Sequence, residues 1–106
     1  MQGKLLRIFI SEADRWQGRP LHEEVVRRAR EEGVAGATVI KGALGFGARS
    51  QAAATEFLRV SEAFPIVIEI VDEEEKITKF LPVLDELIKE GLVTLEKVEV
   101  YAYKHG

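Results

Sequence analysis

Residues 33–47 read GVAGATVIKGALGFG, and the order of elements in the chain can be worked out from this stretch. The run Thr-Val-Ile at 38–40 favours an extended backbone, whereas the glycines around it allow conformations that a Cβ atom would forbid. The stretch therefore predicts a helix end at Gly33, a strand over residues 36–41 and a loop that starts at Gly42. Because glycines also occur in ordinary turns, this loop is either a plain connector or a ligand-binding loop. It lacks the Gly-Lys-Ser/Thr of a phosphate-binding P-loop and the helix signal that follows a dinucleotide fingerprint.

The segment before this stretch predicts a strand and a helix. Residues 4–10 alternate with a period of two, which indicates a first strand with two rather apolar faces. A loop follows over residues 11–19, and Pro20 is typical of a first helical position. From there to Gly33 the apolar residues fall on one helical face, which predicts an amphipathic helix that ends at that glycine.

Two ring side chains in this first part have two interpretations each. Trp16 either stacks on a ligand or packs against a neighbouring helix or subunit, and packing is the commoner role of a lone tryptophan. His22 lies on the predicted helix beside Glu23, and the only other histidine is His105 near the end of the sequence. This pair makes a poor metal site, so we expect His22 to be a solvated helix residue.

The segment after the glycine-rich stretch predicts a loop and a third strand. A loop over residues 42–55 is expected to be functional or disordered, because structureless loops of this length are uncommon in small domains. Residues 57–60 are a candidate for a strand extension. Pro65 then opens the β-branched run 66–71, which indicates a strand with a single carboxylate, Glu69, in its middle.

A second helix and a fourth strand complete the predicted elements. Asp72 with Glu75 fits a capping box, and the apolar residues behind it keep helical spacing. Pro82 lacks an N–H and collides with the preceding turn, so we expect it to kink the helix or to leave its first part partly separate. Gly91 closes the helix in this interpretation, and residues 93–103 alternate as a fourth strand. The apolar helix positions are Ile77, Phe80, Leu81, Leu84, Leu87 and Ile88.

The predicted order is strand, helix, strand, strand, helix, strand. This order is that of the α+β ferredoxin-like sandwich, βαββαβ, in which both helices cover one face of a four-stranded antiparallel sheet. The other face would then expose an apolar patch of a kind that usually marks an association surface. We therefore expect a homo-oligomer with the sheets packed around a common axis. The positions on this face are Leu5, Phe9, Thr38, Ile40, Val67, Val71, Tyr101 and Tyr103.

Length and composition limit the classes of function. The 106 residues fit one domain, and the absence of cysteine excludes disulfides, thiolate metal sites and thiol nucleophiles. The net charge of -3, with both signs mixed along the chain, gives no basic footprint for nucleic acid and no polybasic arm for a membrane surface. The apolar run near the start is too short for a signal segment or a membrane span. We expect a cytoplasmic protein that neither binds nucleic acid nor inserts into a membrane.

Short motifs spread over nearly the whole chain carry a family resemblance. They are Ile10-Ser11-Glu12, Gly33-Val34-Ala35-Gly36-Ala37-Thr38-Val39, Gly45-Phe46-Gly47, Pro65, Glu69-Ile70-Val71 and Val98-Glu99-Val100. In this strand order the motifs resemble the nitrogen-regulatory PII signal proteins, and more closely a small uncharacterised family of PII-like proteins. The resemblance implies a homotrimer of ferredoxin-like domains. It also implies an effector pocket between neighbouring subunits and a loop after the second strand that contacts a protein partner.

The resemblance implies ligand-binding positions as well. The start of the second strand matches the adenine side of the PII pocket, and the third strand matches its nucleotide contacts. The Gly-Phe-Gly triplet matches the base of the regulatory loop, where an arginine offers further polar reach. These positions are Gly36 and Thr38 on the second strand, Gly45, Phe46, Gly47 and Arg49 in the loop, and Glu69 and Val71 on the third strand.

Departures from the PII pattern bear on the ligand. The loop lacks the tyrosine that PII proteins use for uridylylation. The phosphate-binding loop before the last strand is replaced by residues 89–94, and the arginines at the chain end are replaced by Tyr101, Tyr103 and Lys104. An adenine-containing ligand with fewer charges, or a different small effector, therefore fits this chain better than ATP does.

Three functions compete on this evidence. The first is a non-enzymatic trimeric sensor that binds a small effector and changes the order of residues 43–55 toward a protein partner. The second is a divalent-metal-binding protein of the cation-tolerance type, although the sequence lacks soft ligands and a tight carboxylate cluster outside residues 72–75. The third is an enzyme that uses Glu69 as acid or base, but no nucleophile, second carboxylate or histidine has a spacing that places it nearby. We favour the sensor.

Glu69 and Thr38 match neighbouring positions of the PII-like cleft although they lie on different predicted strands. An ionised carboxylate among apolar strand residues needs a donor. That donor is a lysine or arginine of the adjacent subunit, a backbone N–H, or a group of a bound effector. An intersubunit ion pair is the structural interpretation of Glu69, and a ligand contact is the functional one.

Overall fold

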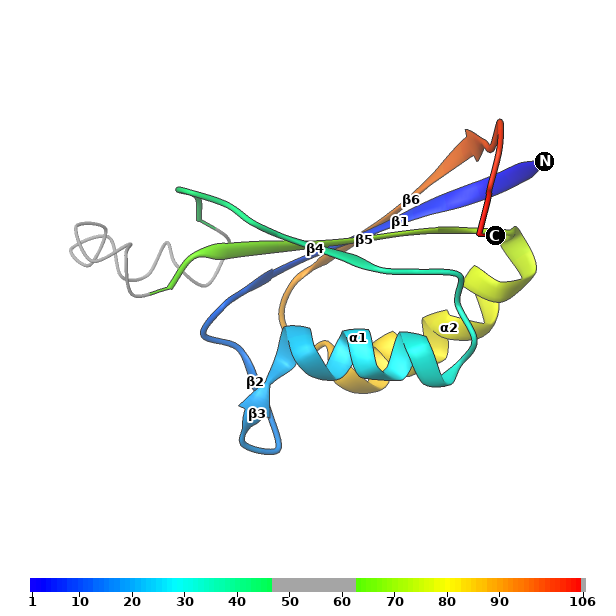
Figure 1. Cartoon of the computed structure of the whole chain (residues 1–106). Coiled ribbons are helices and arrows are strands. Elements are labelled where there is room, and N and C mark those ends of the chain that lie inside the picture. Colours follow the sequence, from blue (N-terminus) through cyan, green and yellow to red (C-terminus); the bar gives the residue numbers. More distant parts are fainter. Residues whose placement is uncertain (47–62, 106) are drawn as a thin grey trace.

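Figure 1 shows the computed structural model, which describes residues 1–46 and 63–105. Its elements follow the predicted order, with one short hairpin added. They are β1 (Gln2–Ser11), β2 (Arg15–Trp16), β3 (Arg19–Pro20), α1 (Leu21–Glu31), β4 (Thr38–Lys41), β5 (Pro65–Asp72), α2 (Glu74–Leu87) and β6 (Leu92–Glu99). The candidate strand extension at 57–60 and the part of the predicted loop from 47 to 55 lie outside the described residues.

The main sheet has four strands in the order β4, β5, β1, β6, and all neighbours are antiparallel. In Figure 1, α1 and α2 lie together on one side of this sheet and leave the other side uncovered. This is the ferredoxin-like arrangement, so the predicted α+β fold class is confirmed.

The core lies between the sheet and the two helices. Three register pairs form its sheet side: Leu6 with Ile70, Ile8 with Ile68 and Ile10 with Ile66. These side chains are buried, as is Phe80 of α2. The residues between them on the same strands point to the uncovered side, because side chains of a strand alternate between its faces.

The uncovered side of the sheet, called the open face below, carries the predicted apolar residues that lie within strands. Residues directly opposite in an antiparallel pair share a face, and Val67 lies opposite both Phe9 and Ile40. The open face thus carries Leu5, Phe9, Thr38, Ile40, Val67 and Val71, together with Leu92 opposite Phe9. The same registers place the polar residues Arg7, Glu69, Thr94 and Glu96 on this face.

α1 begins one residue later than predicted and ends before Gly33 as predicted. Pro20 is its N-cap residue, and Gly33 lies just beyond its C-cap with a φ of 80°, a conformation that favours glycine. The loop predicted over residues 11–19 is wrong in part, because it contains the hairpin of β2 and β3. Gln17 and Gly18 form the hairpin turn with positive φ values, as two-residue turns of this kind require.

The capping box predicted for α2 is wrong. The N-cap residue is Glu73, and it makes no side-chain capping bond. The carboxylate of Asp72 instead accepts hydrogen bonds from the backbone N–H of Glu73 at 2.7 Å and from that of Ala35 at 2.9 Å. Asp72 therefore joins the start of α2 to the segment before β4.

The structure also changes the predicted role of two helix breakers. α2 continues as one helix from Glu74 to Leu87 with Pro82 inside it, so no separate first part is formed, and the alternative of a kink at Pro82 stays a prediction. Gly91 does not close this helix but precedes β6, with a φ of 155°. A Cβ atom there would lie 2.9 Å from the carbonyl oxygen of Phe9. The close approach of the two strands, and not the helix end, therefore explains this glycine.

The fourth strand predicted over residues 93–103 is too long. β6 ends at Glu99, because that residue lies opposite Gln2, where its partner β1 begins. The N–H of Val100 still donates to the carbonyl oxygen of Met1 at 2.8 Å, and the chain then leaves the sheet. Tyr101 and Tyr103 therefore lie outside the strand to which they were assigned.

Candidate functional site

A cavity of about 710 Å³ lies at one end of the sheet. It is bounded by the segment before β4, the end of β5, the start of α2 and the segment after β6. In Figure 1 this is the end of the sheet at which the labelled chain ends lie. The lining residues are Met1, Ala35, Gly36, Ala37, Thr38, Glu69, Val71, Asp72, Glu73, Lys76, Val100, Ala102 and Tyr103.

Four of the predicted ligand-binding residues line this cavity: Gly36, Thr38, Glu69 and Val71. The register of β4 and β5 brings them together, because it places Thr38 directly opposite Glu69. Val71 then follows two residues after Glu69 on the same face of β5. The expectation that Thr38 and Glu69 are neighbours on different strands is confirmed.

The other predicted ligand-binding residues lie elsewhere. Gly45 and Phe46 follow the far end of β4, where the N–H of Gly42 donates to the carbonyl oxygen of Pro65 at 2.8 Å. The side chain of Phe46 is exposed, and neither residue lines the cavity within this one chain. Gly47 and Arg49 lie outside the described residues.

The same chain supplies a donor to Glu69. Nε of Arg7 donates to Oε2 of Glu69 at 2.8 Å, across the register pair that joins β1 and β5. This hydrogen bond raises the pKa of Arg7 above its ordinary value. Arg7 was missed as a site residue. Its place on the open side of the first strand, beside the third strand in a ferredoxin-like sheet, is the signal that could have found it.

The backbone wall of the cavity is held by Asp72. This carboxylate is buried, and its bond to the N–H of Ala35 orients the segment that leads through Gly36 to Thr38. The carbonyl oxygen of Ala35 accepts a long hydrogen bond of 3.4 Å from the hydroxyl of Tyr103. Asp72 and Tyr103 therefore contact the same peptide segment at its two polar groups.

The charges around the cavity disfavour a polyanion. Among the lining side chains, Glu69, Asp72 and Glu73 are acidic and Lys76 is cationic. The Met1 ammonium also lies at the cavity, where it donates to the carbonyl oxygen of Val100 at 3.2 Å. The Lys76 ammonium already donates to the carbonyl oxygen of Gly33 at 3.3 Å. A triphosphate is bound best by several charged or backbone donors, whereas carboxylate and carbonyl oxygens accept from hydroxyl and amino groups. The cavity suits a ligand that is rich in donors and carries little negative charge.

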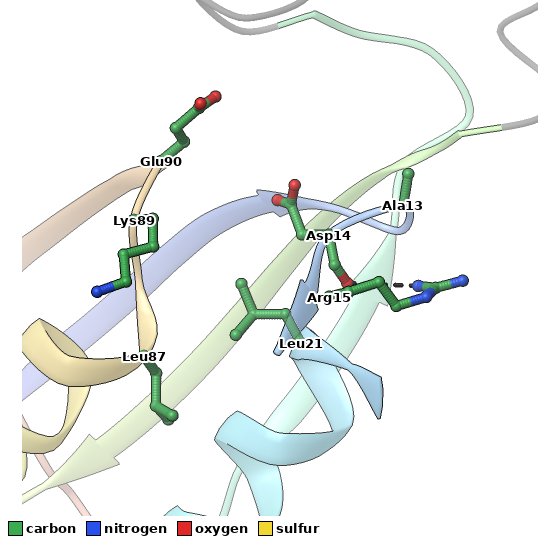
Figure 2. A pocket seen from close by; sticks show the side chains of 7 residues that line it. All are labelled: Ala13, Asp14, Arg15, Leu21, Leu87, Lys89 and Glu90. Atoms are coloured by element: carbon green, nitrogen blue, oxygen red, sulfur yellow. Dashed lines mark hydrogen bonds between the residues drawn. The ribbon is translucent and has the colours of Figure 1, made fainter. Parts of the chain in front are cut away.

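A second hollow, of about 290 Å³, lies between the end of β1 and the turn after α2. Figure 2 shows Leu21 at its centre, with the side chains of Arg15 and Lys89 on opposite sides of that leucine. The Asp14 carboxylate accepts a hydrogen bond from the N–H of Ser11 at 2.9 Å and so stabilises the turn that follows β1. None of the predicted ligand-binding residues lines this hollow, and we assign it no ligand.

Metal binding was expected to be poorly supported by the histidines. His22 is partly buried, and its Nδ1 atom has no hydrogen-bond partner within residues 1–46 and 63–105. His22 lies on the helix as expected, but the prediction that it is solvated is wrong for its Nδ1 atom, which is buried. In the same part of the chain, no group of three or more His, Cys, Asp or Glu side chains could hold a metal ion.

None of the described helices has the length and apolar character needed to cross a membrane.

A separate charged cluster fastens the β2 and β3 hairpin to α1. The buried carboxylate of Glu24 accepts hydrogen bonds from Arg27 and Arg28, and Arg19 approaches it to 3.7 Å. The guanidinium carbons of Arg19 and Arg28 lie 5.9 and 5.1 Å from the ring centroid of Trp16. Trp16 packs against the core, which confirms its predicted packing role.

This cluster predicts a component of acid sensitivity. The hydrogen bond from Arg27 lowers the pKa of the Glu24 carboxyl below its ordinary value of 4.5. A carboxylate with a lowered folded pKa stabilises the fold at neutral pH, and this effect is lost as the pH falls through about 4.5 and below. In urea denaturation at about pH 7 and about pH 3.5, the wild type should lose more stability on acidification than Glu24→Gln does. Glu31→Gln, which removes an exposed partner of the same arginine, is the control. Equal losses in wild type and Glu24→Gln would contradict the assignment.

Comparisons with known proteins give a consistent set of relatives. The family model DUF190, described as Uncharacterized ACR, COG1993, matches residues 3–100. A UPF0166 protein of Aquifex aeolicus is 43% identical over 100 residues, with 92% of this chain and 91% of the relative covered. A UPF0166 protein of Methanocaldococcus jannaschii is 37% identical over 102 residues, with 95% and 94% covered.

Among solved structures, a protein of Thermus thermophilus described as a PII-like signaling protein has a fold similar to that of this chain. Its TM-score is 0.61 at 20% sequence identity, with 92% of this chain and 87% of that chain covered. At this identity the likeness concerns the fold alone, and it agrees with the strand order of the main sheet.

Proposed function

The chain belongs to the DUF190 family and has a PII-like fold, and from that premise we propose that it is a regulatory protein that binds a small effector. The observation that supports this proposal most is the cavity itself. Gly36 precedes β4, Thr38 begins it, and Glu69 and Val71 belong to β5, which is far from β4 in sequence, yet all four line one cavity. The proposed role is sensing and not catalysis.

The effector that we propose is an adenine-containing molecule with fewer charges than ATP, such as adenosine or AMP. Glu69 and the backbone carbonyl groups around Gly36 accept hydrogen bonds, while adenine and ribose supply amino and hydroxyl donors. Thr38 lies directly opposite Glu69 and adds a hydroxyl that donates or accepts. The single positive charge of the Lys76 side chain can pair with one phosphate group but not with the three of a triphosphate.

The working assembly that we propose is a cytoplasmic homotrimer. The open face provides the apolar surface for association, and a neighbouring subunit would close the exposed side of the cavity. The segment after β4 would then present the regulatory loop to a protein partner. Glycine-rich composition and its place after the second strand support this role for the loop.

A thermal-shift screen of adenosine, AMP, ATP and divalent metal ions tests the proposed ligand class. A ligand present at about 100 times its dissociation constant should add about 2.7 kcal/mol to the free energy of unfolding. We expect this effect from adenosine and AMP, and a smaller one from ATP at equal concentration. Stabilisation by metal ions alone would favour the cation-tolerance type of function. No effect from any adenine compound would exclude the proposed effector.

Calorimetry on two carboxylate variants then tests the cavity as the binding site. Glu69→Gln keeps the shape of the side chain and removes its charge, so we expect the affinity for adenosine to fall about tenfold. Glu96→Gln is the matched control, because Glu96 also lies near Arg7, at 3.6 Å, but does not line the cavity. If Glu69→Gln lowers the stability and leaves the affinity unchanged, Glu69 is structural and the cavity is not the site.

A further inference from the structure

Tyr103 belongs to a segment, residues 100–105, that passes along the cavity after leaving the sheet. The backbone bond from Val100 to Met1 fixes the start of this segment. In Figure 1 the red end of the chain bends from the tip of β6 toward the start of α2. Ala102 and Tyr103 line the cavity, while Tyr101 is fully exposed and does not.

The ring of Tyr103 is held at the cavity by weak contacts. Its hydroxyl donates to the carbonyl oxygen of Ala35 at 3.4 Å, which is long for an O–H donor. Its ring lies 5.2 Å from the ring of His105, tilted by 44°. The side chain is 60% exposed and is not part of the core. Core packing therefore does not explain its position, and the ring can adjust to a ligand at little cost.

The surroundings of this ring suit a planar group. Of the described residues that line the cavity, Tyr103 is the one with an aromatic side chain. Val71, Ala37 and Ala102 add apolar surface to the same cavity. Aromatic rings attract one another in offset or tilted stacks with centroids about 4.5 to 7 Å apart. An aromatic heterocycle in the cavity would have a ring partner on one side and hydrogen-bonding groups at its edge.

We infer that Tyr103 stacks on an aromatic ring of the effector and sets the specificity of the cavity for planar heterocycles. This inference rests on the proposed function, because it concerns the same cavity and names the part of the effector that is recognised. Stacking of a base on an aromatic side chain is worth about five- to 150-fold in affinity when the side chain is cut to alanine.

The experiment measures adenosine binding by calorimetry to the full chain and to three variants. Tyr103→Ala should weaken binding by about tenfold or more. Tyr103→Phe keeps the ring and removes the long hydrogen bond, so its affinity should stay within about threefold of wild type. Tyr101→Ala removes the fully exposed neighbouring tyrosine and should bind as wild type does. In NMR, the H2 and H8 resonances of adenosine should shift upfield on binding, and this shift should vanish with Tyr103→Ala.

The outcomes separate this inference from the proposed function. If wild type, Tyr103→Ala and Tyr101→Ala bind adenosine equally, the stacking role is wrong and the effector proposal stands. If wild type binds neither adenosine nor AMP, both are wrong. Loss of binding by Tyr103→Phe would assign the role to the hydroxyl and overturn stacking. Sedimentation of Tyr103→Ala completes the test: a change in assembly would make Tyr103 an interface residue and overturn the inference. If Tyr103→Ala fails to fold, Tyr103→Leu takes its place, because it keeps bulk without a ring.

Discussion

The variant Asp72→Ala is expected to lose about 3 kcal/mol of unfolding free energy and about tenfold in affinity for adenosine. In the wild type, the buried Asp72 carboxylate accepts hydrogen bonds from the backbone N–H groups of Glu73 and Ala35. Alanine would leave both donors without this charged acceptor, and each such bond stabilises the fold by about 1.5 to 3 kcal/mol. Because Ala35 begins the backbone wall of the cavity, the wall would move with the loss of the bond.

Urea denaturation and calorimetry measure the two effects of Asp72→Ala separately. Glu73→Ala is the matched control, because this neighbouring side chain lines the same cavity and makes no side-chain capping bond to α2. Asp72→Asn keeps one oxygen acceptor and should fall between the control and Asp72→Ala. If Asp72→Ala is as stable as Glu73→Ala, the carboxylate does not hold the segment before β4.

The fold could be predicted because its main signals are local. The β-branched alternation of β1 and β5 identifies the core pairs, such as Ile8 with Ile68, and the apolar stripes identify both helices. Gly33 marks the end of α1 through its positive φ. Each of these signals depends on residues close together in sequence, where backbone propensity and side-chain period decide the outcome.

The errors arise where distant segments decide. The carboxylate of Asp72 was assigned to a local capping box, but its partner Ala35 lies 37 positions away. Gly91 was assigned to a helix end, but the carbonyl of Phe9 on another strand explains it. The end of β6 is set by the start of β1 and not by its own alternating sequence, so Tyr103 was assigned to a strand that ends before it.

The candidate site was predicted in part for the same reason. Thr38 and Glu69 could be matched to one cleft through the family resemblance, and the register confirms that they are neighbours. Arg7 and Glu69 form an ion pair although they are 62 positions apart in the sequence. Their contact depends on the register between β1 and β5, which cannot be read from the sequence of either strand. Gly45 and Phe46 remain predictions, because any contact with the cavity would have to come from a neighbouring subunit.

The open face carries a continuous apolar row across the whole sheet. The register places Leu92 opposite Phe9, Phe9 opposite Val67 and Val67 opposite Ile40, so the row runs from β6 to β4. Its two ends are well exposed, with Leu92 at 57% and Ile40 at 44%. Exposed apolar rows of this extent are typical of association surfaces, which is why the proposed trimer uses this face.

Ile40→Arg is expected to dissociate the proposed trimer or to prevent folding. A charged side chain in an apolar interface without a partner costs several kcal/mol, on the order of 3 to 5. The matched control is Val39→Arg, because Val39 is the preceding residue of β4, has a similar exposure of 40%, and points to the opposite side of the sheet. Sedimentation velocity at micromolar concentration should find a trimer for wild type and for Val39→Arg, and a monomer or unfolded chain for Ile40→Arg. A monodisperse wild-type monomer would contradict the PII-like assembly. An unchanged trimer for Ile40→Arg would instead show that association uses another surface, because the arginine would then lie in water.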